Sequence, residues 1–152
     1  MELILEKELD HQQKAVDAII SALDGITMIH PHFAYENPTF DRKEHRLIHN
    51  LSEVQKNIRV DYRGCRDDGN YLNLDIKMET GTGKTYVYTQ TIYEMHKKFG
   101  FNKFIVAVPS LPIKAGTAQF IDDSYVKHHF SDVCGYNCDI ELGILESPKK
   151  KK

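Results

Sequence analysis

The chain has 152 residues and a formal net charge of −2 at pH 7 with its histidines neutral. This length predicts one domain, and this charge excludes a protein that holds nucleic acid by overall positive charge, though not one with a local basic groove. Apolar residues make up 41% and charged residues 28%, which is typical of a globular rather than a disordered chain. No apolar run approaches the roughly 18 residues of a membrane-spanning helix, so we expect no membrane association.

The N-terminal segment predicts a cytoplasmic protein that begins with a helix over residues 10–23. The opening M-E-L-I-L-E-K-E is acidic and mixed, unlike a secretory signal, and three cysteines are typical of reduced thiols in the cytosol. Asp10 and Gln13 have the spacing of a capping box, and Gly25 is suited to end the helix. The apolar residues at helical spacing are Ala15, Val16, Ile19, Ile20 and Leu23.

Residues 26–70 form a polar connecting region with weak structural signals. An apolar strand is expected over residues 26–29, after which His30-Pro31 and Asn37-Pro38 interrupt regular structure. A helix is expected over residues 51–58, with Ser52 as its cap, and a turn is expected over residues 66–70.

Residues 71–152 predict alternating strands and helices. Strands are expected over residues 71–77, 104–108 and 140–145, and helices over residues 84–98, ending at Gly100, and around residues 115–121. The run F-I-V-A-V at 104–108 has the composition of a strand that is buried on both faces. This order predicts an α/β fold with a mainly parallel sheet and right-handed crossovers. The expected organisation is therefore a helix in 1–25, the connecting region 26–70 and an α/β domain in 71–152.

The segment M-E-T-G-T-G-K-T, residues 78–85, stands between an expected strand and an expected helix, which is the setting of a phosphate-binding P-loop. Glycines allow the backbone amides to approach phosphate oxygens, and the helix that follows contributes its positive dipole end. Lys84 is suited to the β- and γ-phosphates, and the hydroxyl of Thr85 is suited to Mg²⁺. These two are the candidate catalytic residues. The candidate nucleotide-binding residues in the loop are Thr80, Gly81, Thr82, Gly83, Lys84 and Thr85.

The loop departs from the full P-loop pattern, which has glycine where this chain has Met78. The ending T-G-T-G-K-T resembles the first motif of superfamily 2 helicases and translocases. The longer string L-D-I-K-M-E-T-G-T-G-K-T, residues 74–85, resembles the first helicase motif of the restriction (Res) subunit of type III restriction–modification enzymes.

Two further segments are similar to motifs of that family. L-D-H-Q-Q-K-A-V, residues 9–16, resembles the glutamine motif, which implies that Gln12, or as the alternative Gln13, contacts adenine. An amide can donate and accept at once, as the N6 and N7 groups of adenine require. F-I-V-A-V-P-S, residues 104–110, resembles the segment that leads into motif Ia, which implies that Ser110 and Lys114 contact nucleic-acid phosphates.

The resemblance implies a RecA-like P-loop NTPase domain that uses ATP and Mg²⁺. It implies the ATP-binding part of a helicase-like motor that couples ATP hydrolysis to movement on double-stranded DNA before cleavage. In that family the subunit also carries a second RecA-like domain and a nuclease, and it acts with a modification (methyltransferase) subunit that recognises the DNA site.

The chain lacks the acidic Asp-Glu motif that follows motif Ia in such motors, since Asp122-Asp123 does not follow an apolar strand. We therefore expect an N-terminal piece whose sheet is incomplete at the C-terminus. It would bind ATP without hydrolysing it efficiently, because the acidic motif and the arginine finger of the second domain are both missing from it. An arginine finger alone contributes about 10³–10⁵ in rate.

Two other functions remain open: a non-catalytic nucleotide-binding module, and another P-loop enzyme such as a small kinase. Cys134 and Cys138 are spaced C-x3-C without a second pair, a weak zinc signal that more often marks buried thiols. The lysine run at 149–152 is typical of a solvated chain end.

Overall fold

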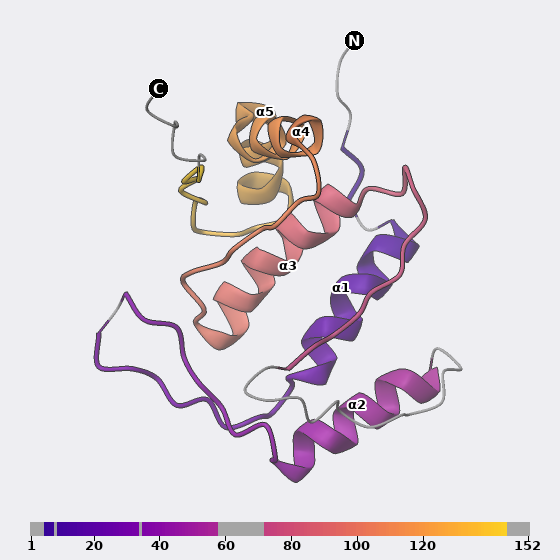
Figure 1. The fold of residues 1–152 in the computed structure, drawn as a ribbon, viewed down its shortest axis with the longest axis vertical. Helices are drawn as coiled ribbons and strands as arrows, with labels where there is room; N and C mark the ends of the chain where they lie inside the picture. The colour runs from indigo at the N-terminus through magenta and orange to yellow at the C-terminus, as the bar shows by residue number, and fades with distance from the viewer. Residues whose placement is uncertain (1–4, 8, 34, 58–71, 146–152) are drawn as a thin grey trace, which may run out of the picture. The chain divides into compact units, whose positions relative to one another are not determined.

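A computed structural model describes residues 5–7, 9–33, 35–57 and 72–145. Its contacts divide the chain into two compact units, one formed by Glu8–Ile105 and the other by Met1–Lys7 with Val106–Lys152. The helices, drawn in Figure 1, are α1 (Asp10–Ala22), α2 (His45–Asn57), α3 (Lys84–Phe99), α4 (Leu111–Asp122) and α5 (Ser124–His128), followed by the π-helical turn η1 (His129–Val133).

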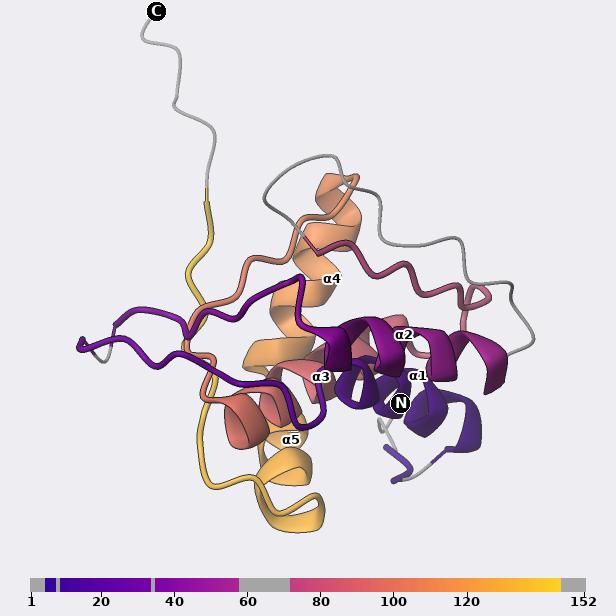
Figure 2. The ribbon, with the colours of Figure 1, turned by 90° about the horizontal axis from the view of Figure 1, so that it is seen from below.

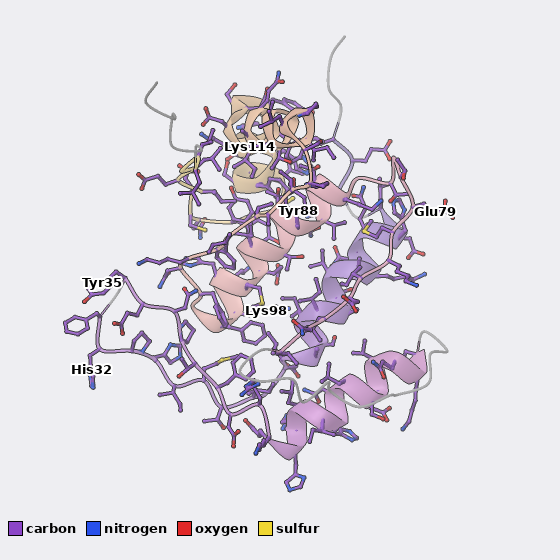
Figure 3. The ribbon with its side chains drawn as sticks, in the orientation of Figure 1. His32, Tyr35, Glu79, Tyr88, Lys98 and Lys114 are labelled. Carbon is purple, nitrogen blue, oxygen red and sulfur yellow. The ribbon has the colours of Figure 1, made fainter. Side chains whose placement is uncertain are left out.

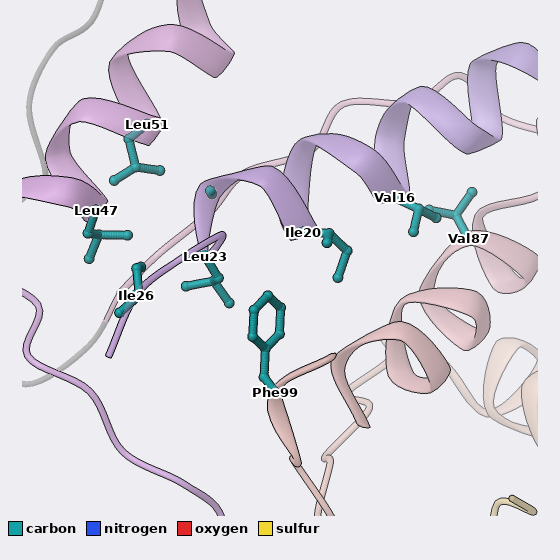
Figure 4. Packing of buried hydrophobic residues seen from close by; sticks show 9 residues of the cluster. Val16, Ile20, Leu23, Ile26, Leu47, Leu51, Val87 and Phe99 are labelled. Carbon is teal, nitrogen blue, oxygen red and sulfur yellow. The ribbon is translucent and has the colours of Figure 1, made fainter. Parts of the chain in front are cut away.

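In the first unit, α1 packs against both α2 and α3, as Figures 1 and 2 show from two directions. Helical periodicity explains this, because Val16 and Ile20 lie one turn apart on one face of α1. Both side chains are almost fully buried. Figure 4 shows the core that they form with the other helices, and its labelled members are Val16, Ile20, Leu23, Ile26, Leu47, Leu51, Val87 and Phe99.

The helix expected over residues 10–23 is confirmed as α1, but the expected capping box is wrong. The N-cap residue is Leu9, and no side chain caps this end. Asp10 is already helical, and its carboxylate accepts a hydrogen bond from Lys14 Nζ at 2.6 Å. A carboxylate in the first turn still favours the helix, because it faces the positive end of the helix dipole. Gly25 has the expected left-handed conformation, with φ +65°.

The helix α2 begins six residues before the expected start at residue 51 and includes Ser52 in its interior, so Ser52 is not its cap. Leu47 and Leu51 lie one turn apart and are the buried residues of α2. The amide of Leu47 donates to the carbonyl of Glu44, in the turn that precedes the helix. Residue 58 and the turn expected over residues 66–70 lie outside the described residues.

The expected RecA-like fold with a mainly parallel sheet is wrong for the described part of the chain, which is helical and contains no strand. Residues 72–77, 104–108 and 140–145 are not in strands. The strand expected over residues 26–29 is reduced to one antiparallel bridge between Ile29 and Thr39. In the run 104–108, expected to be buried on both faces, Ile105 is 90% exposed.

The hydrogen bonds around Asn37 lie directly before the run that was expected to form a strand. A strand requires a neighbour whose backbone pairs with its own amide and carbonyl groups. Here the side chain of Asn37 forms hydrogen bonds with the backbone just before the apolar run. Its Oδ1 accepts from the amides of Asn102 and Lys103, both at 2.8 Å, and its Nδ2 donates to the carbonyl of Lys103 at 2.7 Å. The apolar composition of the run predicted burial, but it contained no information on which segment would pair with it.

In the second unit, α4 begins four residues before the expected start and contains the whole helix expected over residues 115–121. The carboxylate of Asp123 caps α5 by accepting from the amides of Tyr125 and Val126, at 2.8 and 3.2 Å. Among the described residues of this unit, Phe130 and Val126 are the most fully buried apolar ones. No helix in the described ranges is long and apolar enough to cross a lipid bilayer.

Candidate functional site

The glycine loop, defined here as residues 79–85, leads from an extended segment into α3. Gly81 and Gly83 have φ values of +82° and +84°, a left-handed conformation that glycine adopts without steric cost. No side chain caps the start of α3, so the positive end of the helix dipole is open to an anion. Figure 3 shows Glu79 in this loop, near the N-terminal end of α1.

Two side chains of the glycine loop bind the carbonyl of Glu79. The hydroxyl of Thr82 donates to it at 2.7 Å, and the ammonium of Lys84 donates to the same oxygen. The Lys84 side chain therefore folds back onto its own loop. Sequence analysis missed Glu79 because it acts through its backbone, which every residue type shares.

The other predicted loop residues surround this turn. Thr80 and Gly81 are exposed. Thr85 is half-buried in the first turn of α3, and its carbonyl accepts from the hydroxyl of Thr89 at 2.8 Å. Within the described ranges, no group of three or more His, Cys, Asp or Glu side chains gathers to hold a metal ion.

Gln12 reaches the glycine loop from α1. It lies one turn before Val16 on the face that carries the core, so the helix directs this polar side chain toward the start of α3. Its Nε2 donates to the carbonyl of Thr82 at 3.1 Å, and the residue is only 7% exposed. A Cβ atom on Gly83 would lie 2.3 Å from this nitrogen. The left-handed φ favours glycine at this position, and a side chain there would displace the end of Gln12.

The other end of the Gln12 amide is unused. Its Oε1 is buried and has no hydrogen-bond partner. Leaving a buried acceptor without a partner costs about 1–3 kcal/mol, so a water molecule or a ligand that supplies the missing donor would be favoured there. Gln13 differs, because its Oε1 accepts from Gln90 at 3.3 Å and its Nε2 donates to Asp17 at 2.8 Å. Of the two glutamines considered from the sequence, Gln12 has the free acceptor.

The imidazole of His11 is a contact that sequence analysis missed. Its Nε2 lies 3.1 Å from the same Thr82 carbonyl oxygen that Gln12 contacts. Its only sequence signal was its place beside Gln12 in the glutamine motif, and periodicity alone does not distinguish it from other exposed polar residues of α1.

Ser110 and Lys114, the predicted nucleic-acid contacts, lie in the second unit. Ser110 is the exposed N-cap residue of α4, and its carbonyl accepts from the amide of Lys114 at 2.9 Å, so the first turn of α4 brings the two together. The ammonium of Lys114 donates to the carbonyl of Leu145. Its charge is thus engaged by the chain itself in this structure.

The acidic pair Asp122-Asp123 has structural contacts in the second unit. Asp122 Oδ1 accepts from Lys127 Nζ at 2.7 Å, while Asp123 caps α5. Both carboxylates therefore support the junction between α4 and α5.

The cysteines of the second unit do not form a metal cluster with neighbouring histidines in the described ranges. Cys134 Sγ lies 3.5 Å from the Nε2 of the buried His129. Burial lowers the pKa of His129, with a smaller contribution from Lys7, and burial raises the pKa of Cys138, assisted by Asp139. The Cys138 thiol thus favours its protonated form, whereas metal ligation requires a thiolate.

Comparison with a family model and comparison with individual proteins point to the same family. The family described as "Type III restriction enzyme, res subunit" matches residues 6–150. The chain is similar to the Res subunit of the type III restriction-modification enzyme EcoPI of Escherichia phage P1, with 37% identity over 148 residues, covering 95% of this chain and 15% of that protein. It is also similar to the EcoP15I Res subunit of Escherichia coli, with 36% identity over 152 residues, covering 95% of this chain and 15% of that protein.

A third relative extends the match to another organism. The chain is 40% identical over 129 residues to the StyLTI Res subunit of Salmonella typhimurium, covering 84% of this chain and 11% of that protein. The chain thus spans 11–15% of the length of these curated relatives.

Proposed function

This chain belongs to the family of type III restriction enzyme Res subunits, and from that premise we propose that it binds ATP as the nucleotide-binding part of a helicase-like motor. The glycine loop would hold the phosphates, and Gln12 would contact the adenine. The motor would couple ATP hydrolysis to movement on double-stranded DNA before cleavage. It would act in the cytoplasm with a modification (methyltransferase) subunit.

The partnerless Oε1 of Gln12 is the observation that carries this proposal. Adenine presents an amino donor at N6 beside an acceptor at N7, and guanine presents two acceptors at the corresponding positions. The Oε1 of Gln12 would accept from N6, and the second hydrogen on Nε2 would reach N7. The Thr82 carbonyl already binds Nε2, so it fixes which end of the amide donates. Guanine would place its O6 against Oε1 without a hydrogen between them.

The glycine loop supports the phosphate part of the proposal. The uncapped start of α3 and the two left-handed glycines are the arrangement that suits an anion. Lys84 would exchange the Glu79 carbonyl for phosphate oxygens, and Thr85 would offer its hydroxyl to Mg²⁺. Bound Mg²⁺ would neutralise part of the charge of the triphosphate.

Ser110 and Lys114 are proposed contacts for DNA phosphates. Their shared position at the first turn of α4 supports this role, since backbone amides at a helix start and a nearby ammonium both suit phosphate. Lys114 would have to leave the carbonyl of Leu145 to make the contact.

Calorimetric titration of the 152-residue chain with Mg-ATP and with Mg-GTP tests the proposal. We expect ATP to bind more tightly than GTP in the wild type. Gln12→Ala should remove this preference, because the base then loses the amide that distinguishes N6 from O6. Gln13→Ala is the matched control, since Gln13 is a neighbouring amide whose groups are engaged by Asp17 and Gln90. A folded wild-type chain that binds neither nucleotide would refute the proposal.

A further inference from the structure

The carbonyl oxygen of Thr82 receives two side chains from the start of α1. The Nε2 atoms of His11 and Gln12 both lie 3.1 Å from it. A carbonyl oxygen has two lone pairs, so two donors satisfy it completely. The contact requires a proton on Nε2 of His11, because a carbonyl only accepts.

Holding this carbonyl also sets the direction of the next amide. The peptide between Thr82 and Gly83 is trans, since the described residues contain no cis peptide bond. In a trans peptide the C=O and the N–H point in opposite directions. A Thr82 carbonyl turned toward α1 therefore turns the N–H of Gly83 away from α1. This amide belongs to the loop that would surround the phosphates.

His11 and Gln12 share this contact but differ in everything else. Gln12 is buried in the unit and has the unused Oε1, so its removal disturbs both the core and the base contact. The imidazole of His11 is exposed. The hydrogen bond that the structure shows for His11 is the one to the Thr82 carbonyl. Its effect on a nucleotide would thus pass through the orientation of the loop.

We propose that His11 is a positioning residue of the nucleotide site, which holds the Thr82 carbonyl so that the amide of Gly83 faces the phosphates. This inference rests on the proposed ATP-binding function. It assigns His11 no contact with the base, so it separates the orientation of the loop from the selection of adenine.

Three variants of the 152-residue chain test the inference by titration with Mg-ATP, Mg-GTP and inorganic tripolyphosphate. His11→Ala should weaken all three by a common factor of about two- to tenfold, as expected for the loss of one hydrogen bond. The ratio of ATP to GTP affinity should stay at its wild-type value. His11→Gln should restore binding, because a glutamine Nε2 is the same number of bonds from the backbone as the histidine Nε2. Lys14→Ala, one turn further along the exposed face of α1, should leave all three affinities unchanged.

The outcomes distinguish this inference from the proposed function. A wild-type chain that binds ATP while His11→Ala binds it equally well would overturn the inference and leave the proposed function standing. A change in the ATP to GTP ratio in His11→Ala would also overturn it, because it would assign His11 a contact with the base. A failure of His11→Gln to restore binding, with an unchanged melting temperature, would count against the hydrogen bond. A wild-type chain that binds none of the three ligands would overturn both proposals.

Discussion

The two ends of α3 are both flanked by a left-handed glycine, yet they use their polar groups differently. Gly83 before the helix and Gly100 after it have φ values of +84° and +78°. At the C-terminal end, the amide of Gly100 donates to His96 at 2.9 Å and that of Phe101 donates to Met95 at 3.4 Å. The hydrogen bond from Gly100 to His96 is the one that defines the αL motif, and together the two bonds engage carbonyls near the end of the helix.

The N-terminal end is left open by comparison. No side chain caps it, and the nearby Gln12 has a buried Oε1 without a partner. The two ends are about 24 Å apart, given the 16 residues of α3 and a rise of about 1.5 Å per residue. The difference teaches that the same glycine conformation either closes a helix or prepares a binding site, depending on whether the surrounding polar groups are used.

The largest expected effect is on stability at the closed end. Phe99→Ala should lower the free energy of unfolding by about 3–5 kcal/mol, because it removes a buried aromatic side chain from the core. Urea denaturation followed by circular dichroism measures this change. Phe33→Ala is the matched control, since Phe33 is 56% exposed and should change stability by less than about 0.5 kcal/mol. Equal losses of unfolding free energy in the two variants would show that Phe99 does not stabilise this end of α3.

The next effect concerns binding at the open end. Lys84→Ala should weaken Mg-ATP by about 10- to 100-fold, which is the range for losing a hydrogen bond between charged groups. The free energy of unfolding should change little, because Lys84 is exposed. Calorimetry and urea denaturation of the same preparations separate the two effects. Unchanged ATP affinity would mean that the lysine stays on the Glu79 carbonyl.

Two glycine variants sharpen the difference within the open end. Gly81→Ala and Gly83→Ala should each cost about 1–2 kcal/mol of stability, because both put a Cβ atom on a left-handed residue. A Cβ at Gly81 meets open space, whereas one at Gly83 collides with Gln12. Only Gly83→Ala should therefore also remove the preference for ATP over GTP. If both variants keep that preference, the position of Gln12 does not depend on Gly83.

The smallest effect is expected for Lys98→Ala at the closed end. Lys98 Nζ lies 3.4 Å from Glu94 Oε2 in a partly exposed pair four residues apart on the helix, and helix pairs at this spacing contribute about 0.3–0.5 kcal/mol. Figure 3 places Lys98 near the end of α3 away from Glu79. ATP affinity should stay at the wild-type value, which also makes this variant the charge-matched control for Lys84→Ala. Weaker ATP binding would show that overall positive charge, rather than the open end, attracts the nucleotide.

Local sequence determined much of the helical structure. The apolar spacing of residues 10–23 and 84–98 predicted α1 and α3 almost to the residue, because one face of each helix is buried. Gly25 and Gly100 were predicted as helix ends because few other residues adopt positive φ. The family was also evident from the sequence, since its motifs are short strings that need no fold to be read.

Tertiary structure decided what no local pattern contained. The apolar run 104–108 predicted a buried strand, but a strand depends on a partner elsewhere in the chain, and in the described ranges no segment pairs with this run. The place of Gln12 beside Thr82 likewise depends on the packing of α1 against α3. Side-chain periodicity records which face of a segment prefers burial, whereas hydrogen-bond partners distant in sequence are selected only when the chain folds.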